Sequence, residues 1–199
     1  TTDAVGTLAR FNKPAGLAID ATGILFVADE LNHAIRRIAT DRTVTTLAGL
    51  KGTLGSTDAI GVLARFRAPD GIGVDSGGNV FVADTGNHTI RLITPAGRVT
   101  TIGGAAGSPG STNGLGSAAR FRTARGVVIE SQSSIFVVDS LNHTIRKGSS
   151  IALPQIDVPP QSLLVGLGQP ASFTVTASGG APLSFQWTKN GRNIAGATA

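Results

Sequence analysis

The sequence predicts an all-β protein built from short strands that tight turns connect. Glycine supplies 27 of the 199 residues, and hydrophobic residues make up 41% of the chain against 15% for charged ones. Valine, isoleucine, threonine and phenylalanine fill the stretches between the glycines. These residue types favour strands, glycine favours turns, and the low charge argues against an intrinsically disordered chain. The third observation is a unit of 55 residues that occurs three times.

The three copies are in register, without insertion or deletion between equivalent positions. Each copy contains Ala-Arg-Phe, beginning at residues 9, 64 and 119, and an Asn-His pair, beginning at residues 32, 87 and 142. Apolar strings lie between these markers, namely ILFVAD, NVFVAD and IFVVD. Self-similarity at a fixed period is the signature of a repeat architecture.

Each copy divides into four short strands. In the first copy we expect them at residues 17–20, 24–28 and 34–39 and in the string VTTLAG. Antiparallel meanders of four strands are the blades of β-propellers, so the sequence predicts three four-stranded blades. The second strand is apolar at every position, as expected when neighbouring blades cover both of its faces. The third copy departs from the pattern, because no VTTLAG string follows Lys147.

The end of the chain has a different pattern and predicts a second domain. We expect propeller blades over residues 1–150, a proline-bearing linker over 151–160 and an incomplete immunoglobulin-like β-sandwich over 161–199. Three prolines hold the linker extended and keep it out of a sheet interior. Beyond the linker, the strings ASFTVTAS and LSFQWTKNG alternate with period two, which predicts strands.

Charge and cysteine content narrow the classes of partner. The formal net charge is +5, and there is no cysteine, so neither a disulfide framework nor a thiolate metal site is possible. A basic excess can indicate nucleic acid, but several arginines recur at fixed repeat positions, which favours a structural use. The apolar runs are too short to span a bilayer. We therefore expect neither nucleic-acid binding nor membrane insertion.

The repeated string P-x-G-[LI]-[AG]-[IV]-D, followed by V-A-D-x-x-N-H-x-I-R, resembles the NHL repeat over residues 1 to about 148. The resemblance implies a six-bladed, sometimes five-bladed, β-propeller. Three copies make half a ring at most. The open faces at both ends predict aggregation, or two copies that pair into a six-bladed ring.

The C-terminal segment resembles the start of a bacterial immunoglobulin-like domain. The string GQPASFTVTA and the string PLSFQW would be its B and C strands, and Trp187 would be its core tryptophan. NHL blades followed by such a domain resemble large exported bacterial proteins, which implies a secreted or cell-surface location. Residue 1 is threonine, and we expect the chain to be a piece of something longer, without a signal peptide of its own.

Each copy carries an Asp, a His and an Arg at fixed positions, which invites a catalytic or a metal-binding interpretation. A reactive site needs a convergent, unequal set of groups, whereas these recur identically on different blades. We therefore expect a structural motif, in which Asp29 accepts backbone N–H groups of the turn, Asn32 takes unusual backbone angles and Arg36 pairs with a neighbouring blade's carboxylate. The motif residues are Asp29, His33, Arg36, Asp84, His88, Arg91, Asp139, His143 and Arg146.

The recurrent Ala-Arg-Phe has two interpretations as well. A basic residue beside an aromatic one can bind a ligand. The structural alternative, which we favour, wedges Phe11, Phe66 and Phe121 between blades and leaves their arginines hydrogen-bonded at the rim.

Binding function is better sought where the copies differ, just before the innermost strand. There the copies carry Asn12, Lys13 and Ala15, then Arg67, Ala68 and Asp70, then Arg122, Thr123 and Arg125. Propellers usually bind partners at the mouth of the channel that these strands line, although plain solvent exposure also permits such variation. The candidate ligand-binding residues are Lys13, Arg67, Asp70, Arg122 and Arg125.

These observations predict a non-catalytic binding or scaffold segment of a larger exported bacterial protein, whose partner is a protein or a glycan. We expect no catalytic residue, no metal and no cofactor. One alternative is a propeller-type lyase whose metal and catalytic residues lie in other blades. The other is an RNA-binding NHL propeller, which Lys13, Arg67, Arg122 and Arg125 support and Asp70 weakens.

Overall fold

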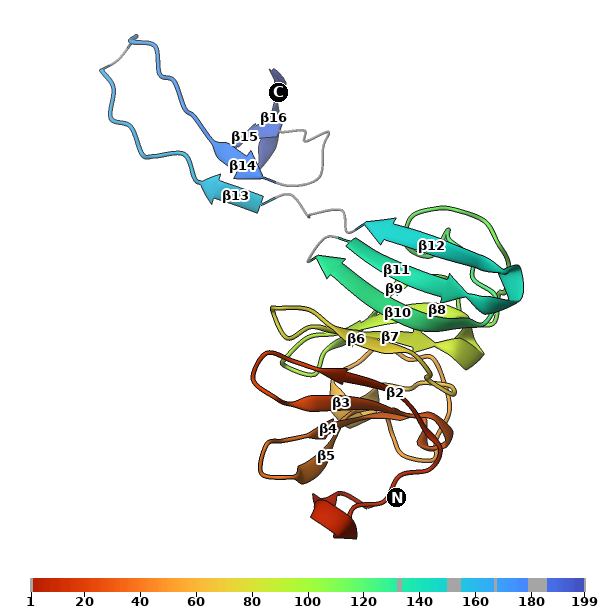
Figure 1. Ribbon diagram of the computed structural model, residues 1–199. Helices are drawn as coiled ribbons and strands as arrows, with labels where there is room; N and C mark the ends of the chain where they lie inside the picture. Colours follow the sequence, from red (N-terminus) through yellow and green to blue (C-terminus); the bar gives the residue numbers. More distant parts are fainter. Residues whose placement is uncertain (1, 132–133, 150–154, 167, 179–185, 199) are drawn as a thin grey trace. The chain divides into compact units, whose positions relative to one another are not determined.

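The chain folds into two compact units, Thr1–Ser149 and Ser150–Ala199, each considered by itself. The computed structural model describes residues 2–131, 134–149, 155–166, 168–178 and 186–198 (Figure 1). Over these residues the structure consists of antiparallel strands and single-turn 3-10 helices, without an α-helix. The all-β class predicted from the sequence is confirmed. Within the same residues, no helix is long and apolar enough to cross a membrane.

The first blade is a five-stranded sheet with the order β1-β5-β4-β3-β2. Its strands are β1 (Ala4–Val5), β2 (Pro14–Ile19), β3 (Leu25–Asp29), β4 (Ala34–Ile38) and β5 (Thr43–Ala48). The four strands predicted from the sequence are β2 to β5, and β1 adds an outer edge by pairing with β5. The turn between β2 and β3 forms because the Asp20 carboxylate accepts the N–H groups of Thr22 and Ile24.

The second and third blades repeat this meander (Figure 1). Blade 2 comprises β6 (Ile72–Val74), β7 (Val80–Asp84), β8 (Thr89–Ile93) and β9 (Val99–Gly103). Blade 3 comprises β10 (Ala124–Ser131), β11 (Ser134–Asp139) and β12 (Thr144–Ser149). Among the described residues blade 3 has no fourth strand, in agreement with the missing VTTLAG string.

The hydrophobic core lies between the blades and not within one of them. Phe26, Ala28 and Ile35 of blade 1 pack on Ile72, Val82 and other apolar residues of blade 2. Phe81, Ala83 and Ile90 of blade 2 pack in the same way on blade 3. Strand β7 is buried at every position, which confirms that both faces of this middle strand are covered.

The glycine of each Pro-x-Gly string permits close contact between neighbouring inner strands. A Cβ atom built on Gly16 would lie 2.2 Å from the Asp70 carbonyl oxygen, and one on Gly71 would lie 1.7 Å from that of Arg125. Both distances are far below van der Waals contact. A side chain at either position would therefore force the blades apart.

The second unit contains two antiparallel strand pairs. Its strands are β13 (Gln155–Val158), β14 (Thr176–Ser178), β15 (Gln186–Lys189) and β16 (Arg192–Thr198). Strand β13 lies within the predicted linker and pairs with β14, which covers only the end of the string ASFTVTAS. The rings of Phe173 and Trp187 lie 6.3 Å apart. Part of the string LSFQWTKNG, residues 183–185, lies outside the described residues, and the immunoglobulin-like sandwich stays a prediction.

Candidate functional site

The Asp, Asn, His and Arg of the motif meet at one end of each blade, here called the motif end, where the inner strand begins and the turn after the second strand lies. In blade 1 this turn is a single 3-10 turn, Glu30–Asn32, followed by His33 in the left-handed region with φ of 54°. His88 and His143 repeat this conformation at 60° and 55°. The prediction that Asn32 takes the unusual backbone angles is wrong. Asn32 instead lies inside the 3-10 turn, where its amide donates to the Asp29 carboxylate at 2.7 Å.

The arginine of the motif is buried in a cluster of acceptors. Nη1 of Arg36 donates to Asp29 Oδ2 at 2.8 Å, and Nη2 donates to Asp3 Oδ1 at 2.6 Å. The guanidinium also lies over the Phe11 ring, 4.9 Å from its centroid. The side chains of Arg36 and Asp29 are fully buried. The partner is therefore not a neighbouring blade's carboxylate, as the sequence predicted, because the arginine lies directly opposite the carboxylate of its own blade.

The same cluster recurs in the other two blades, and we call it the arginine clamp. Arg91 contacts Asp84 at 2.8 Å, Asp58 at 2.6 Å and the Phe66 ring. Arg146 contacts Asp139 at 3.0 Å, Asn113 at 2.6 Å and the Phe121 ring. Every clamp holds the segment that precedes its blade onto the blade itself through charge-assisted hydrogen bonds.

Asp84 illustrates the electrostatics of the clamp. Burial raises the pKa of Asp84 to about 6, while the Arg67 N–H, the Arg91 guanidinium and the Asn87 amide hold it from rising further. Oδ1 accepts the Arg67 N–H at 2.7 Å, so the carboxylate also fixes the start of the inner strand. Asp29 and Asp139 accept the N–H groups of Asn12 and Arg122 in the same way, and not those of their own turns. At neutral pH the Asp84 carboxylate is ionised and faces a cation, which is the arrangement that stabilises a buried charge.

The histidines connect one blade to the next. Nδ1 of His33 accepts the Ala68 N–H at 3.1 Å, and Nδ1 of His88 accepts the Thr123 N–H at the same distance. The donor residues, Ala68 and Thr123, also have positive φ, which turns their N–H groups toward the preceding blade. Among the described residues, no three His, Asp or Glu side chains gather as a metal site would require.

We expect acidification to weaken the contact between blades 2 and 3. Burial lowers the pKa of His88, the charges of Arg67 and Arg122 lower it further, and Asp139 opposes them. Since the folded pKa is below the unfolded value, the unfolded chain takes up the proton first. The free energy of unfolding therefore falls as the pH drops below about 6.5, the unfolded value, and continues to fall until the folded histidine titrates.

The measurement is urea unfolding of the wild type and of His88→Asn between about pH 7.5 and about pH 5.5. Asparagine tolerates the left-handed backbone, so the variant removes the titration and keeps the turn. The wild type should lose more stability on acidification than the variant does. If the free energy of unfolding had the same pH dependence in both proteins, protonation of His88 would not account for the loss of stability.

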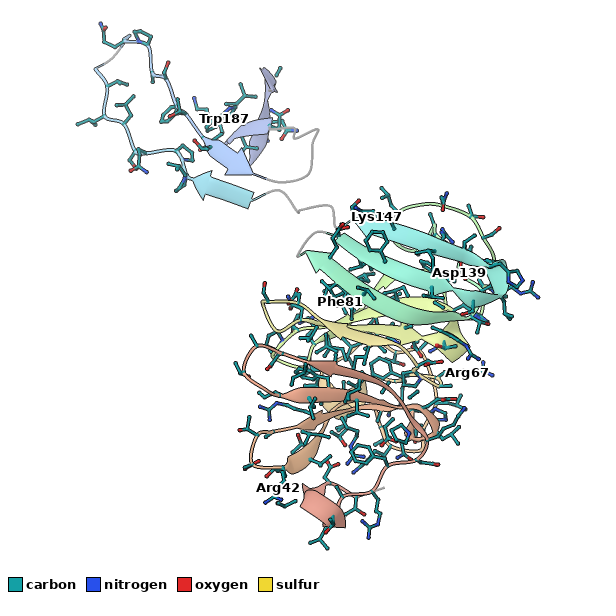
Figure 2. All side chains as sticks on the ribbon, viewed as in Figure 1. Arg42, Arg67, Phe81, Asp139, Lys147 and Trp187 are labelled. Atoms are coloured by element: carbon teal, nitrogen blue, oxygen red, sulfur yellow. The ribbon has the colours of Figure 1, made fainter. Side chains whose placement is uncertain are left out.

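The candidate ligand-binding residues all lie at the motif end of the first unit. Lys13, Arg67, Arg122 and Arg125 are exposed, and Asp70 is partly so. Figure 2 shows Arg67 at the same end as Asp139, whereas Arg42, in the turn between β4 and β5, lies at the other end.

The structure brings some of these residues together and leaves others apart. Asp70 of blade 2 lies 3.8 Å from Arg125 of blade 3, and Lys13 pairs with Glu30 of its own blade at 2.7 Å. Arg67 and Arg122 lie near His88, as their effect on its pKa indicates. Within the described part of the chain, neither of these two arginines has a carboxylate at ion-pair distance.

Sequence reasoning missed one set of contacts. Asp3, Asp58 and Asn113 complete the arginine clamps, yet they lie before the Ala-Arg-Phe marker, outside the strings that define the repeat. A signal was present, because the pairs Thr2-Asp3, Thr57-Asp58 and Thr112-Asn113 have the same spacing of 55 residues as the histidines. Thr85 was also missed, and its hydroxyl donates to the Ala124 carbonyl of blade 3 at 2.6 Å.

Three antiparallel meanders packed face to face, with a repeated clamp at one end, define a propeller-type repeat protein. Residues 66–91 match the NHL repeat family, so the chain contains an NHL repeat. Human NHL repeat-containing protein 2 is 34% identical over 94 residues, which are 46% of this chain and 13% of that protein. The chain therefore matches only a small part of the length of this curated relative.

Solved structures resemble a larger share of the chain. The crystal structure of an auxiliary nutrient binding protein from Bacteroides thetaiotaomicron has a TM-score of 0.58 and 28% identity, over 66% of this chain and 36% of that one. A protein of unknown function from the same organism has a TM-score of 0.64 and 19% identity, over 75% of this chain and 37% of that one. These similarities support the propeller-like fold.

Proposed function

We propose that the blades are a non-catalytic binding scaffold of a larger exported bacterial protein, and that their partner is a protein or a glycan. The observation that supports this proposal most strongly is that the repeated residues make internal contacts, whereas the varied residues are exposed. The repeated Asp, Asn, His and Arg form the hydrogen bonds of the clamps and of the contacts between blades. The varied residues at the motif end, including Arg67 and Arg122, are exposed instead.

The similarity to a nutrient-binding protein supports this proposal. That protein is 28% identical over two thirds of this chain and comes from a Bacteroides species. The same comparison supports a secreted or cell-surface location. We extend the proposal to the whole chain. The blades occupy residues 1–150, a linker occupies residues 151–160, and an immunoglobulin-like module over residues 161–199 spaces the blades from the rest of the protein or attaches them to it.

The binding surface can be tested by reversing charge at the motif end. We expect Arg67→Glu/Arg122→Glu to weaken retention of the chain by about tenfold in gels that contain an immobilised bacterial or plant polysaccharide, because unpaired cations steer and hold anionic groups. Arg42→Glu/Arg98→Glu is the matched control, since it makes the same change in net charge at exposed arginines of the β4–β5 and β8–β9 turns, at the opposite end of the blades. Dextran, which is uncharged, tests whether retention depends on charge.

Protein partners are tested in parallel by capture from culture supernatant with the same three proteins. Loss of binding in the double variant alone supports the motif end as the binding surface. Equal binding by all three proteins would place the surface elsewhere. Absence of any polysaccharide or protein partner for the wild type would contradict the proposed function.

We further propose that a second copy of the chain covers the open faces of blades 1 and 3. We call the apolar contact between two neighbouring blades a seam. On blade 1, Leu17 is 63% exposed, although its equivalent in blade 2, Ile72, is buried in the seam with blade 1. On blade 3, Ile145 is 65% exposed, although its equivalent Ile90 is buried against blade 3. The open faces thus carry the two halves of the seam that already joins neighbouring blades.

The two open faces have complementary shapes, because that of blade 3 is bulkier than the corresponding face of blade 2 and that of blade 1 is hollowed. Blade 3 has Val128 and Val138 where blade 2 has Gly73 and Ala83, so its open face is bulkier. Blade 1 has a hollow with a mainly apolar lining, which includes Ala15 at the position that Asp70 has in blade 2. Its lining residues are Phe11, Pro14, Ala15, Gly16, Leu17, Val27 and Ile38. Two copies that meet blade 3 to blade 1 at both ends would close a six-bladed ring.

Analytical ultracentrifugation tests this pairing. We expect a dimer, and we expect Leu17→Glu to raise its dissociation constant at least about tenfold, because a charge would be buried without a partner. Leu63→Glu is the control, since Leu63 is equally exposed at 67% but lies in the connection between blades. A monomeric wild type, or equal effects of the two substitutions, would contradict the pairing.

A further inference from the structure

The residue that completes each arginine clamp has a different chemical nature in blade 3. Asp3, Asp58 and Asn113 occupy equivalent positions, and each places Oδ1 at 2.6 Å from Nη2 of its arginine. The guanidiniums of blades 1 and 2 therefore face two carboxylates each. Arg146 faces one carboxylate and one amide.

The residue that follows also differs, and only in blade 3. Alanine follows Asp3 and Asp58, whereas Gly114 follows Asn113. A glycine has no Cβ to shield its backbone nitrogen from the side chain before it. The sequence around Asn113 is exposed, so water has access to it.

The amide nitrogen of Asn113 is unengaged within the part of the chain that the structure describes. In blade 2, the second oxygen of Asp58 accepts the Thr101 N–H of β9 at 2.9 Å. Blade 3 has no such strand among its described residues, and no hydrogen bond from Asn113 Nδ2 is present there. The leaving group of a deamidation would therefore have nothing to hold it.

We propose that Asn113 is a site of intramolecular deamidation, which converts the neutral contact of blade 3 into the Asp–Arg pair of the other blades. The Gly114 nitrogen attacks Asn113 Cγ, the N–H proton passes to the departing amide, and ammonia leaves as a succinimide ring closes. The hydrogen bond from Arg146 to Oδ1 stabilises the negative charge that develops on this oxygen. Water then opens the ring, so that one water is consumed and one ammonia is released overall.

Ring opening has two products, and the clamp distinguishes them. Cleavage at the side-chain carbonyl gives an ordinary aspartate, whose carboxylate occupies the position that Asp58 has in blade 2 and pairs with Arg146. Cleavage at the other carbonyl gives isoaspartate, which lengthens the backbone and moves the carboxylate. The contact with Arg146 favours the first product, so maturation would give blade 3 the same clamp as its neighbours.

The test is incubation of the full chain at mildly alkaline pH, followed by peptide mass spectrometry that separates Asn, Asp and isoaspartate. The pair Asn190–Gly191 is an internal control, because it has the same dipeptide in the turn between β15 and β16. We expect conversion of Asn113, and a larger share of Asp over isoaspartate there than at Asn190. Unfolding in urea should remove this difference between the two sites.

Gly114→Ala is the matched variant, since alanine occupies the equivalent positions 4 and 59. Its Cβ would lie 3.0 Å from Ala118, so the thermal midpoint of the variant is measured beside its conversion rate. The substitution should slow conversion at Asn113 by about tenfold or more and leave Asn190 unchanged. Asn113→Asp provides a second readout, because it should raise the thermal midpoint of the first unit at low salt. The proposal fails if Asn113 remains an amide while Asn190 converts, or if the glycine substitution has no effect on the rate.

Discussion

Replacement of Gly71 by alanine should destabilise the blades by about 3 kcal/mol or more, because it introduces a backbone clash that no rotamer can relieve. The new Cβ would lie 1.7 Å from the Arg125 carbonyl oxygen and 3.0 Å from Gly126 Cα. Since Gly71 does not have positive φ, the alanine is not otherwise strained. The blades must move apart, and the apolar seam between blades 2 and 3 opens with them.

The repeat supplies the control for this prediction. Gly126 is the equivalent residue of blade 3, and its Cβ would approach only the Val138 side chain of its own blade, at 2.8 Å. We expect Gly126→Ala to cost much less, because a side chain can shift where a carbonyl group cannot. Urea unfolding followed by far-ultraviolet circular dichroism measures both. The single tryptophan, Trp187, lies in the other unit, so its fluorescence does not report on the blades. Similar losses for the two variants would contradict the close-contact explanation.

Much of the blade architecture could be predicted from the sequence, because it depends on patterns that are local and repeated three times. The apolar second strands predicted strands covered on both faces, and β7 of blade 2 is indeed buried at every position. In the first copy, Phe26 and Ala28 lie in the contact with blade 2, while the other face of blade 1 is open. The absent string after Lys147 predicted that blade 3 has no fourth strand among the residues that the structure describes. In each case the signal lies within a few residues of the structure that it determines.

The errors concern contacts between residues that are far apart or that compete for one partner. Asp3 and Arg36 are 33 residues apart and meet only once β1 has paired with β5. Asn32 has the propensity for a left-handed backbone, but its amide is bound to Asp29, so the following histidine takes that conformation. Local propensity is overridden when a tertiary hydrogen bond uses the side chain.

The candidate binding site could be predicted only as a region. Variation between copies identified the exposed residues of the motif end, since residues needed by every blade cannot vary. It could not separate Lys13, which is neutralised by Glu30, from Arg67 and Arg122, which have no such carboxylate in the described structure. That distinction depends on the identity of residue 30 in blade 1, where the other copies have threonine and serine.

Removal of the Arg91 guanidinium should have the other large effect. We expect Arg91→Met to destabilise the blades by about 3 to 5 kcal/mol, because it leaves the buried Asp84 carboxylate without its counterion. The same substitution removes the hydrogen bonds to the Arg65 and Thr57 carbonyls, at 2.9 and 3.1 Å, and the contact with the Phe66 ring. The loop that connects blades 1 and 2 would then be held to blade 2 only by its contacts with β9 and the turn before it, such as that of Asp58 with Thr101.

Arg146→Met is the matched comparison, because the geometry of the clamp is the same but its electrostatics and burial are not. The Arg146 side chain is 15% exposed, whereas that of Arg91 is fully buried, and Arg146 faces a single carboxylate. Water can reach Asp139 more easily once the guanidinium is gone, so the loss should be smaller by about 2 kcal/mol. Each arginine packs on the phenylalanine of its own clamp, Phe66 or Phe121. Equal losses in urea unfolding would mean that this packing, and not charge pairing, accounts for the stability of the clamp.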